Sequence, residues 1–109
     1  MVKTATDVRD IIRCYVDKPK RDIKVQRVIL YGSYARGKPR EESDIDIAVI
    51  SDDFAKTSWV QRQELLGVRM LGCDTHLAPI GYTFQEYVHP QENPFLEEII
   101  RTGVVMFEG

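Results

Sequence analysis

The sequence predicts an α/β (α+β) fold, in which an antiparallel or mixed β-sheet is covered by helices. The first observation is that apolar residues at helical spacing alternate along the chain with short apolar runs typical of strands. The second is that the 109 residues contain no internal repeat, linker or low-complexity segment. This length suits one domain, so we expect residues 1–109 to fold as a single unit.

The first half of the chain predicts a helix followed by two strands. A helix is expected over residues 5–17, ended by Pro19, because apolar side chains recur at the spacing of one helical face. The apolar run 28–31 predicts a buried strand. After it, Gly32 and Ser33 turn the chain, and a short helix is expected to open at 33–36 before the breakers Gly37 and Pro39. The second strand alternates between two faces, one formed by Ile45, Ile47 and Val49 and the other by Asp44, Asp46 and Ala48.

The second half predicts two helices and two strands. Ser58 and Gln61 form a capping-box pattern at the start of a helix over about 59–71. Residues 74–80 read as a third strand, ended by Pro79 and Gly81. Asn93 and Pro94 then suit the start of a helix that ends near Gly103, and residues 104–107 can add a last short strand.

Composition excludes several classes of protein. The chain is 43% hydrophobic and 29% charged, which is too apolar for disorder, and its net charge of −2 provides no basic field for nucleic acid. No apolar run approaches the roughly 18 residues of a membrane span, and no signal-peptide core is evident. Cys14 and Cys73 are too few for a disulfide framework, so we expect both to be reduced in a cytoplasmic protein.

Two aspartates stand on the second predicted strand. Asp44 and Asp46 are separated by one residue, so their side chains point to the same face of the strand. Two like charges at this distance repel unless a cation lies between them, and aspartate oxygens together with substrate phosphates are ligands that suit Mg²⁺. The alternative is a solvated strand edge, which is the commoner role of such a pair.

A phosphate-binding loop is predicted just before this strand. Gly32 allows the backbone to approach a ligand closely, and free N–H groups after it can bind an anion. The Ser33 hydroxyl can donate to a phosphate oxygen, and Arg36 adds a positive charge one turn later. A Gly-Ser pair alone is most often a turn, but together with the two aspartates it predicts binding of a nucleoside triphosphate with Mg²⁺.

The string "GSYARGKPREESDIDIAVI" resembles the signature of the DNA polymerase beta-like nucleotidyltransferase superfamily, and within it the minimal nucleotidyltransferase (MNT) family. The stretches "CDTHLAPIGYTFQEY" and "PFLEEIIRTGVVMFEG" resemble the family's later strand and its closing helix and strand. The resemblance covers residues from about 25 to the end and implies a small nucleotidyltransferase palm. It implies that Gly32, Ser33 and Arg36 bind the nucleotide and that Asp44, Asp46 and Asp74 are catalytic and hold metal.

Several assignments remain open beside these. Asp52 and Asp53 compete with Asp74 for the third carboxylate, although capping a turn is the simpler role for them. His76 would share a strand face with Asp74, and an exposed or hydrogen-bonded histidine is the alternative to a catalytic one. Trp59, Tyr82 and Tyr87 could stack on a base, or could pack in the core or an interface.

The resemblance implies transfer of a nucleotidyl group, with AMP from ATP as the expected donor chemistry. Two Mg²⁺ ions, or Mn²⁺, would be held by the three aspartates. MNT proteins typically pair with a helical HEPN toxin, and some transfer AMP to a tyrosine of that partner. The chain is therefore expected to act as an antitoxin enzyme, with homo-oligomerisation left open. The alternatives are a steric antitoxin without chemistry and a small-molecule (antibiotic-type) adenylyltransferase.

Overall fold

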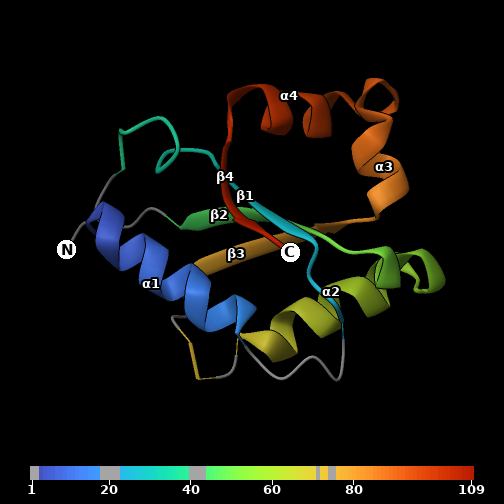
Figure 1. The fold of residues 1–109 in the computed structure, drawn as a ribbon, viewed down its shortest axis with the longest axis horizontal. Helices are drawn as coiled ribbons and strands as arrows, with labels where there is room; N and C mark the ends of the chain where they lie inside the picture. The colour runs from blue at the N-terminus through green and yellow to red at the C-terminus, as the bar shows by residue number, and fades with distance from the viewer. Residues whose placement is uncertain (1–2, 18–22, 40–43, 71, 74–75) are drawn as a thin grey trace.

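The computed structural model describes residues 3–17, 23–39, 44–70, 72–73 and 76–109. Its centre is a four-stranded mixed sheet in the order β3-β2-β1-β4 (Figure 1). β1 (Arg27–Tyr31) pairs antiparallel with both β2 (Ile45–Ile50) and β4 (Val104–Glu108), whereas β3 (Leu77–Tyr82) runs parallel to β2. The predicted α+β architecture is confirmed.

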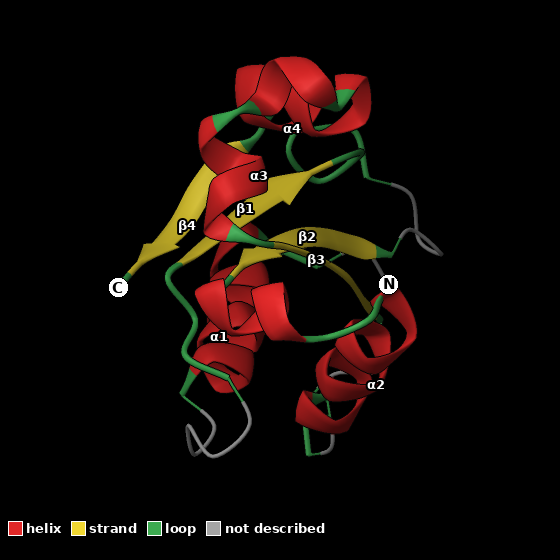
Figure 2. Ribbon diagram, turned by 90° about the vertical axis from the view of Figure 1, so that its right-hand side faces the viewer, coloured by secondary structure: helices red, strands yellow, loops and turns green. Residues whose placement is uncertain are grey.

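Helices cover both faces of this sheet. In Figure 2, α1 (Ala5–Val16) and α2 (Trp59–Arg69) lie on one side, and α3 (Phe84–Val88) and α4 (Pro94–Thr102) lie on the other. Two short 3₁₀ turns complete the described chain, η1 (Asp52–Lys56) after β2 and η2 (Pro90–Glu92) before α4. None of the helices in the described part of the chain is long and apolar enough to cross a membrane.

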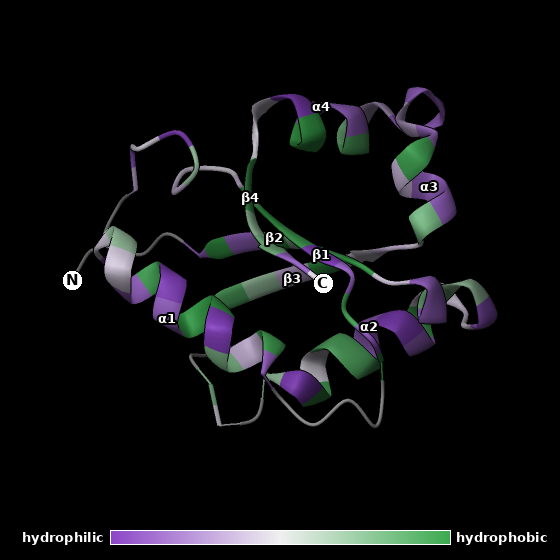
Figure 3. Ribbon diagram, in the orientation of Figure 1, coloured by the Kyte–Doolittle hydropathy of each residue, from purple (hydrophilic) through white to green (hydrophobic). Residues whose placement is uncertain are grey.

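The alternation of side chains along β2 divides the core into two clusters. Ile45, Ile47 and Val49 pack toward α1 and α2, whereas Ala48 and Ile50 pack toward α4. Hydropathy follows the same division, because the strands at the centre of Figure 3 are mainly hydrophobic and the polar residues gather on the outer sides of the helices. Asp46 shares the face of Ala48 and Ile50 by the two-residue period of a strand, so it faces the α4 side.

The helix starts follow the predicted capping chemistry. Ser58 accepts a hydrogen bond from the backbone of Gln61, whose side chain accepts one from the backbone of Ser58, so the predicted capping box of α2 is confirmed. Asn93 caps α4 through the Leu96 N–H, with Pro94 in the first turn. Thr4 and Asp7 form a further capping box at the start of α1.

The third strand differs from the prediction in its limits. β3 continues through Pro79 and Gly81, which we expected to end it. Proline is tolerated there because β3 is at the edge of the described sheet, where one side needs no ladder hydrogen bonds. At Gly81 the missing side chain makes room for the Phe54 ring and the Arg62 side chain, to which an added Cβ would come within 2.8 and 2.9 Å.

Two further predictions were wrong, and one lies outside the described residues. Cys14 and Cys73 form a disulfide instead of being reduced, because α1 and the connection after α2 meet with the two Cα atoms 6.1 Å apart. The short helix predicted at 33–36 is instead a series of turns, and the left-handed Gly37 (φ +70°) follows directly. The expected effect of Pro19 falls on residues that are not described.

Candidate active site

The Gly32 backbone and the Asp46 side chain are in close contact at the end of β1. Gly32 has φ +77°, a left-handed conformation that glycine adopts without a steric penalty. A Cβ added to Gly32 would lie 2.3 Å from Oδ2 of Asp46, so the carboxylate occupies the space that any other residue would need. The predicted phosphate turn and the predicted metal-binding strand therefore meet at this point.

The chain after Gly32 is closed by backbone hydrogen bonds. The Arg36 N–H donates to the Gly32 carbonyl at 3.1 Å, and the Lys38 N–H donates to the Ser33 carbonyl at 3.0 Å. Ser33 is partly exposed, and its hydroxyl makes no hydrogen bond with any described residue. The turn thus presents the partly exposed Ser33 one residue after the Gly32–Asp46 contact, with Arg36 exposed on its surface.

The charges of the site act on Asp46. Asp44 is exposed just before β2, and Asp46 is partly buried within it. Burial raises the pKa of Asp46, the negative charge of Asp44 raises it further, and the Arg36 guanidinium opposes both effects. A divalent cation bound between the two carboxylates would offset the penalty on the ionised form of Asp46.

The third predicted carboxylate cannot be placed in this geometry, because Asp74 lies outside the described residues. Where description resumes, His76 is exposed, and its carbonyl accepts a hydrogen bond from the Ile45 N–H at 2.8 Å. The described chain therefore enters β3 directly beside Asp44 and Asp46. Within the described ranges, no group of three or more His, Cys, Asp or Glu side chains is arranged to hold a metal ion.

The competing carboxylates are engaged in the fold at the opposite end of β2. Asp53 accepts a hydrogen bond from the Lys24 N–H at 2.7 Å, and the Asp52 N–H donates to the Gln26 side chain at 2.7 Å. Both stand in the first turn of η1, which Ser51 caps. The predicted capping role belongs instead to Ser51, and neither Asp52 nor Asp53 lies with Asp44 and Asp46.

Of the aromatic residues singled out from the sequence, Trp59 is half exposed, and the other two are buried or hydrogen-bonded. The guanidinium of Arg62 lies over the Trp59 ring, Tyr82 is buried, and the Tyr87 hydroxyl accepts a hydrogen bond from Arg27. Tyr31, which was not singled out from the sequence, lies opposite Asp46 across the β1–β2 pair. Its position directly before Gly32 was the available signal.

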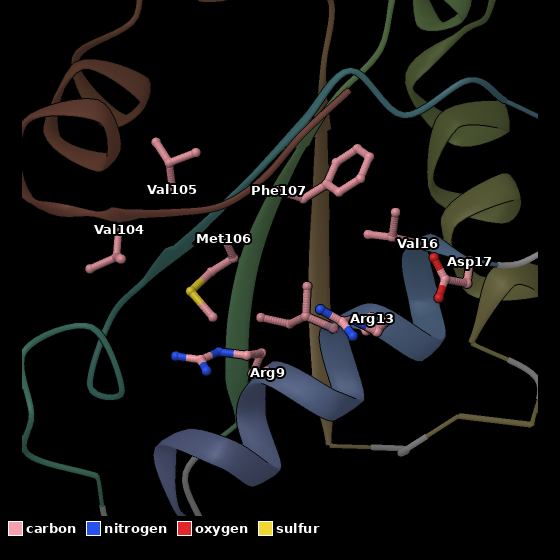
Figure 4. Close-up of a pocket in the computed structure, with 9 residues that line it drawn as sticks. Arg9, Arg13, Val16, Asp17, Val104, Val105, Met106 and Phe107 are labelled. Carbon is pink, nitrogen blue, oxygen red and sulfur yellow. The ribbon is translucent and has the colours of Figure 1, made fainter.

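The groove drawn in Figure 4 is separate from this site. It has a volume of about 400 Å³ and lies between α1 and β4. Arg9 and Arg13 line one side of it, and Val104 to Phe107 line the other. Neither Asp44 nor Asp46 contributes to it, so this groove gives no information about the candidate active site.

Comparison with known proteins identifies the family. Residues 15–109 match the family model described as polymerase beta, nucleotidyltransferase. The chain belongs to this nucleotidyltransferase family. It is similar to a Methanocaldococcus jannaschii protein, MJ1379, which is provisionally named a protein adenylyltransferase, with 40% identity over 106 residues that cover 95% of this chain and 98% of the relative. A second relative from that organism, MJ0141, carries the same provisional name and is 33% identical over 82 residues, covering 74% of this chain and 78% of its own.

Solved structures share the nucleotidyltransferase fold. A protein from Sulfolobus solfataricus, provisionally described as a nucleotidyltransferase, superposes with a TM-score of 0.64 at 16% identity, covering 94% of this chain and 78% of that one. A toxin–antitoxin structure with AMP-PNP gives a TM-score of 0.57 at 21% identity, covering 95% and 73%. These likenesses establish the fold, and the family match establishes that the chain is a nucleotidyltransferase enzyme.

Proposed function

We propose that this nucleotidyltransferase transfers AMP from ATP to a hydroxyl group, namely a tyrosine of a HEPN-type partner toxin, and so acts as an antitoxin. The contact between the Gly32 turn and the Asp46 carboxylate carries the proposal. It supports the proposal because it brings the proposed phosphate-binding turn next to one of the two proposed metal-binding aspartates. The proposed site residues are Gly32, Ser33, Arg36, Asp44, Asp46 and Asp74.

The donor set fits Mg²⁺. Asp44 and Asp46 supply hard carboxylate oxygens. Burial raises the pKa of Asp46, and the nearby Asp44 charge raises it further, so a bound cation would favour the ionised carboxylate. Asp74 is proposed as the third ligand. Bound Mg²⁺ would supply charge neutralisation for the phosphates and for the leaving pyrophosphate.

The chain's own residues would bind and orient the nucleotide. The Ser33 hydroxyl and the backbone of the Gly32 turn would donate hydrogen bonds to phosphate oxygens, and Arg36 would add a positive charge. The acceptor hydroxyl oxygen would attack the α-phosphorus, the bond from that phosphorus to the bridging oxygen would break, and pyrophosphate would leave. The acceptor's proton would pass to Asp74.

The acceptor is proposed to belong to another protein. The name of MJ1379 describes protein adenylylation, and one structural relative is a toxin–antitoxin pair with AMP-PNP. The surface of α2 supports a protein partner, since Trp59, Val60 and Val68 are exposed apolar residues on a single helix.

Intact-mass spectrometry tests this function. The chain is co-expressed with a candidate HEPN-type partner, and the purified complex is incubated with ATP and Mg²⁺. We expect the partner's mass to increase by one or more AMP units, and not to increase with Asp46→Asn. A steric antitoxin would be favoured by two results together. The partner's mass would stay unchanged, and Asp46→Asn would neutralise the partner's toxicity as well as the wild type does. Turnover of a small hydroxyl compound by the lone chain would favour the antibiotic-type enzyme.

A further inference from the structure

An aromatic side chain lies directly beside the candidate phosphate site. Tyr31 is the last residue of β1, precedes Gly32 and is paired with Asp46 in the β1–β2 register. Side chains directly opposite in an antiparallel pair share one face, with Cβ atoms about 4.5–5.5 Å apart. Burial and the Asp46 charge raise the pKa of Tyr31 to about 12, which agrees with this proximity.

A second ring extends this aromatic surface from α4. The Phe95 ring packs against Tyr31 at a centroid distance of 5.8 Å and an interplanar angle of 89°. Phe95 is nonetheless 52% exposed, whereas Leu96 beside it is fully buried in the core. Phe95 therefore offers an exposed apolar ring that is packed against Tyr31, the residue paired with Asp46.

The position of Phe95 is held firmly by its helix. Leu96 and Ile99 anchor α4 on the sheet through the same cluster that includes Tyr31. Asn93 caps the first turn, and Pro94 restricts its backbone. The exposed ring is therefore presented by a fixed element, so little ordering would be needed for it to bind a flat ligand.

We propose that Tyr31 and Phe95 form the site for the nucleobase of the bound nucleotide, with Phe95 as the stacking surface. This inference rests on the proposed function, because it takes the triphosphate to lie on Gly32 and Ser33. The remainder of a nucleotide bound there needs an apolar, flat surface close to Asp46. Aromatic rings stack on bases with an energy of about 1–3 kcal/mol per base.

The other aromatic side chains described near the sheet are less suited to this role. Trp59 is also exposed, but it lies on α2, across the sheet from α4, and the Arg62 guanidinium lies over its ring. Tyr82 is buried, and Tyr87 is held by Arg27. Phe95 thus combines exposure, rigidity and proximity to Asp46 as none of these three does.

Binding measurements with two probes test the inference. Titration calorimetry compares ATP with inorganic tripolyphosphate, both with Mg²⁺, because the second probe carries phosphates without a base. Phe95→Ala is expected to weaken ATP binding about tenfold and to leave tripolyphosphate binding unchanged. Phe95→Trp should keep ATP affinity, and in a Trp59→Phe background its fluorescence should be quenched by ATP but not by tripolyphosphate.

A matched control is available on α3. Phe84 is also exposed, at 39%, and contacts Tyr87 with a centroid distance of 6.2 Å. Phe84→Ala should leave both affinities unchanged. Phe95→Leu keeps most of the apolar volume while removing the ring, and it should behave like Phe95→Ala if stacking is the cause.

Four outcomes would overturn the inference. They are unchanged ATP affinity in Phe95→Ala, an equal loss for ATP and tripolyphosphate, wild-type ATP affinity in Phe95→Leu, and loss of partner binding alone, which would make Phe95 an interface anchor. These results are distinguishable from failure of the proposed function. If the proposed function were wrong, the double variant Asp44→Asn/Asp46→Asn, which keeps Phe95, would still bind both probes in a Mg²⁺-dependent way.

Discussion

At the scale of single residues, the candidate site depends on one close contact. The sequence indicated that Gly32 and Asp46 belong to the same site, because the Gly-Ser pair and the Asp-x-Asp pair both occur in it. It could not indicate that the Asp46 carboxylate would fill the space beside the Gly32 backbone. That contact depends on the pairing of β1 with β2, which joins residues separated by a loop.

Replacing Gly32 by alanine tests this contact. Gly32→Ala should lower the free energy of unfolding by more than about 1–2 kcal/mol, because the left-handed backbone penalty is joined by a clash with Asp46. Gly37→Ala is the matched control, since its φ is +70° but nothing lies within 4 Å of an added Cβ. Urea unfolding of the two variants measures the difference.

Removing the Asp46 carboxylate should restore part of the free energy of unfolding that Gly32→Ala loses. Asp46→Ala combined with Gly32→Ala should be more stable than Gly32→Ala alone, because the clashing carboxylate is gone. Equal stability of Gly32→Ala and Gly37→Ala would contradict the contact.

Asp46 itself is expected to destabilise the metal-free protein at neutral pH. Its folded pKa is raised by burial and by Asp44, so its favourable contribution is present below the unfolded pKa and is lost as the pH rises through the folded pKa. Asp46→Asn should therefore unfold at a higher temperature than the wild type at pH 7 without divalent ions. The difference should shrink as the pH falls toward the ordinary aspartate range near 4.

Thermal unfolding followed by circular dichroism across this pH range checks the prediction. Asp52→Asn serves as the control, because Asp52 lies at the other end of β2 and should not show the same dependence. A pH-independent difference, or a less stable Asp46→Asn at pH 7, would contradict it.

At the scale of elements, local signals predicted most helices and strands correctly. The capping residues and the two-residue alternation on β2 depend on near neighbours, so the sequence displays them. The failures depended on residues distant in the chain. Pro79 is accommodated because β3 is an edge strand of the described sheet, and Cys14 meets Cys73 because α1 packs beside the end of α2.

The disulfide should be a major source of stability. It links residues 59 apart in sequence, and the chain-entropy model gives about 4 kcal/mol for a loop of that length. Cys14→Ser/Cys73→Ser should therefore lower the free energy of unfolding by up to this amount. The wild type in reducing agent should match the double variant, and the variant itself should not respond to reductant.

Thiol quantification in denaturant, with and without reductant, verifies the bond independently. Two reactive thiols in the untreated protein, together with no effect of reductant on urea unfolding, would refute the link between α1 and the connection that precedes β3.

At the scale of the whole molecule, the sheet brings the proposed nucleotide site to the edge where β1 ends and β2 begins (Figure 1). The helices of the α1 face complete the core, while α4 on the other face presents Phe95 near the site. The sequence could predict the phosphate loop and the carboxylate pair because they are contiguous motifs. It could not predict the contribution of α4, since Tyr31 and Phe95 are brought together only by the packing of that helix on the sheet.

The central claim is that Gly32, Ser33, Asp44 and Asp46 form one metal-dependent nucleotide site. Titration calorimetry of ATP against the wild type and against Asp44→Asn/Asp46→Asn, each with and without Mg²⁺, tests it most directly. Asparagine keeps the shape of aspartate but removes the charge that would hold the cation. We expect ATP binding only for the wild type in Mg²⁺. Equal affinity of the wild type and the double variant in Mg²⁺ would contradict it.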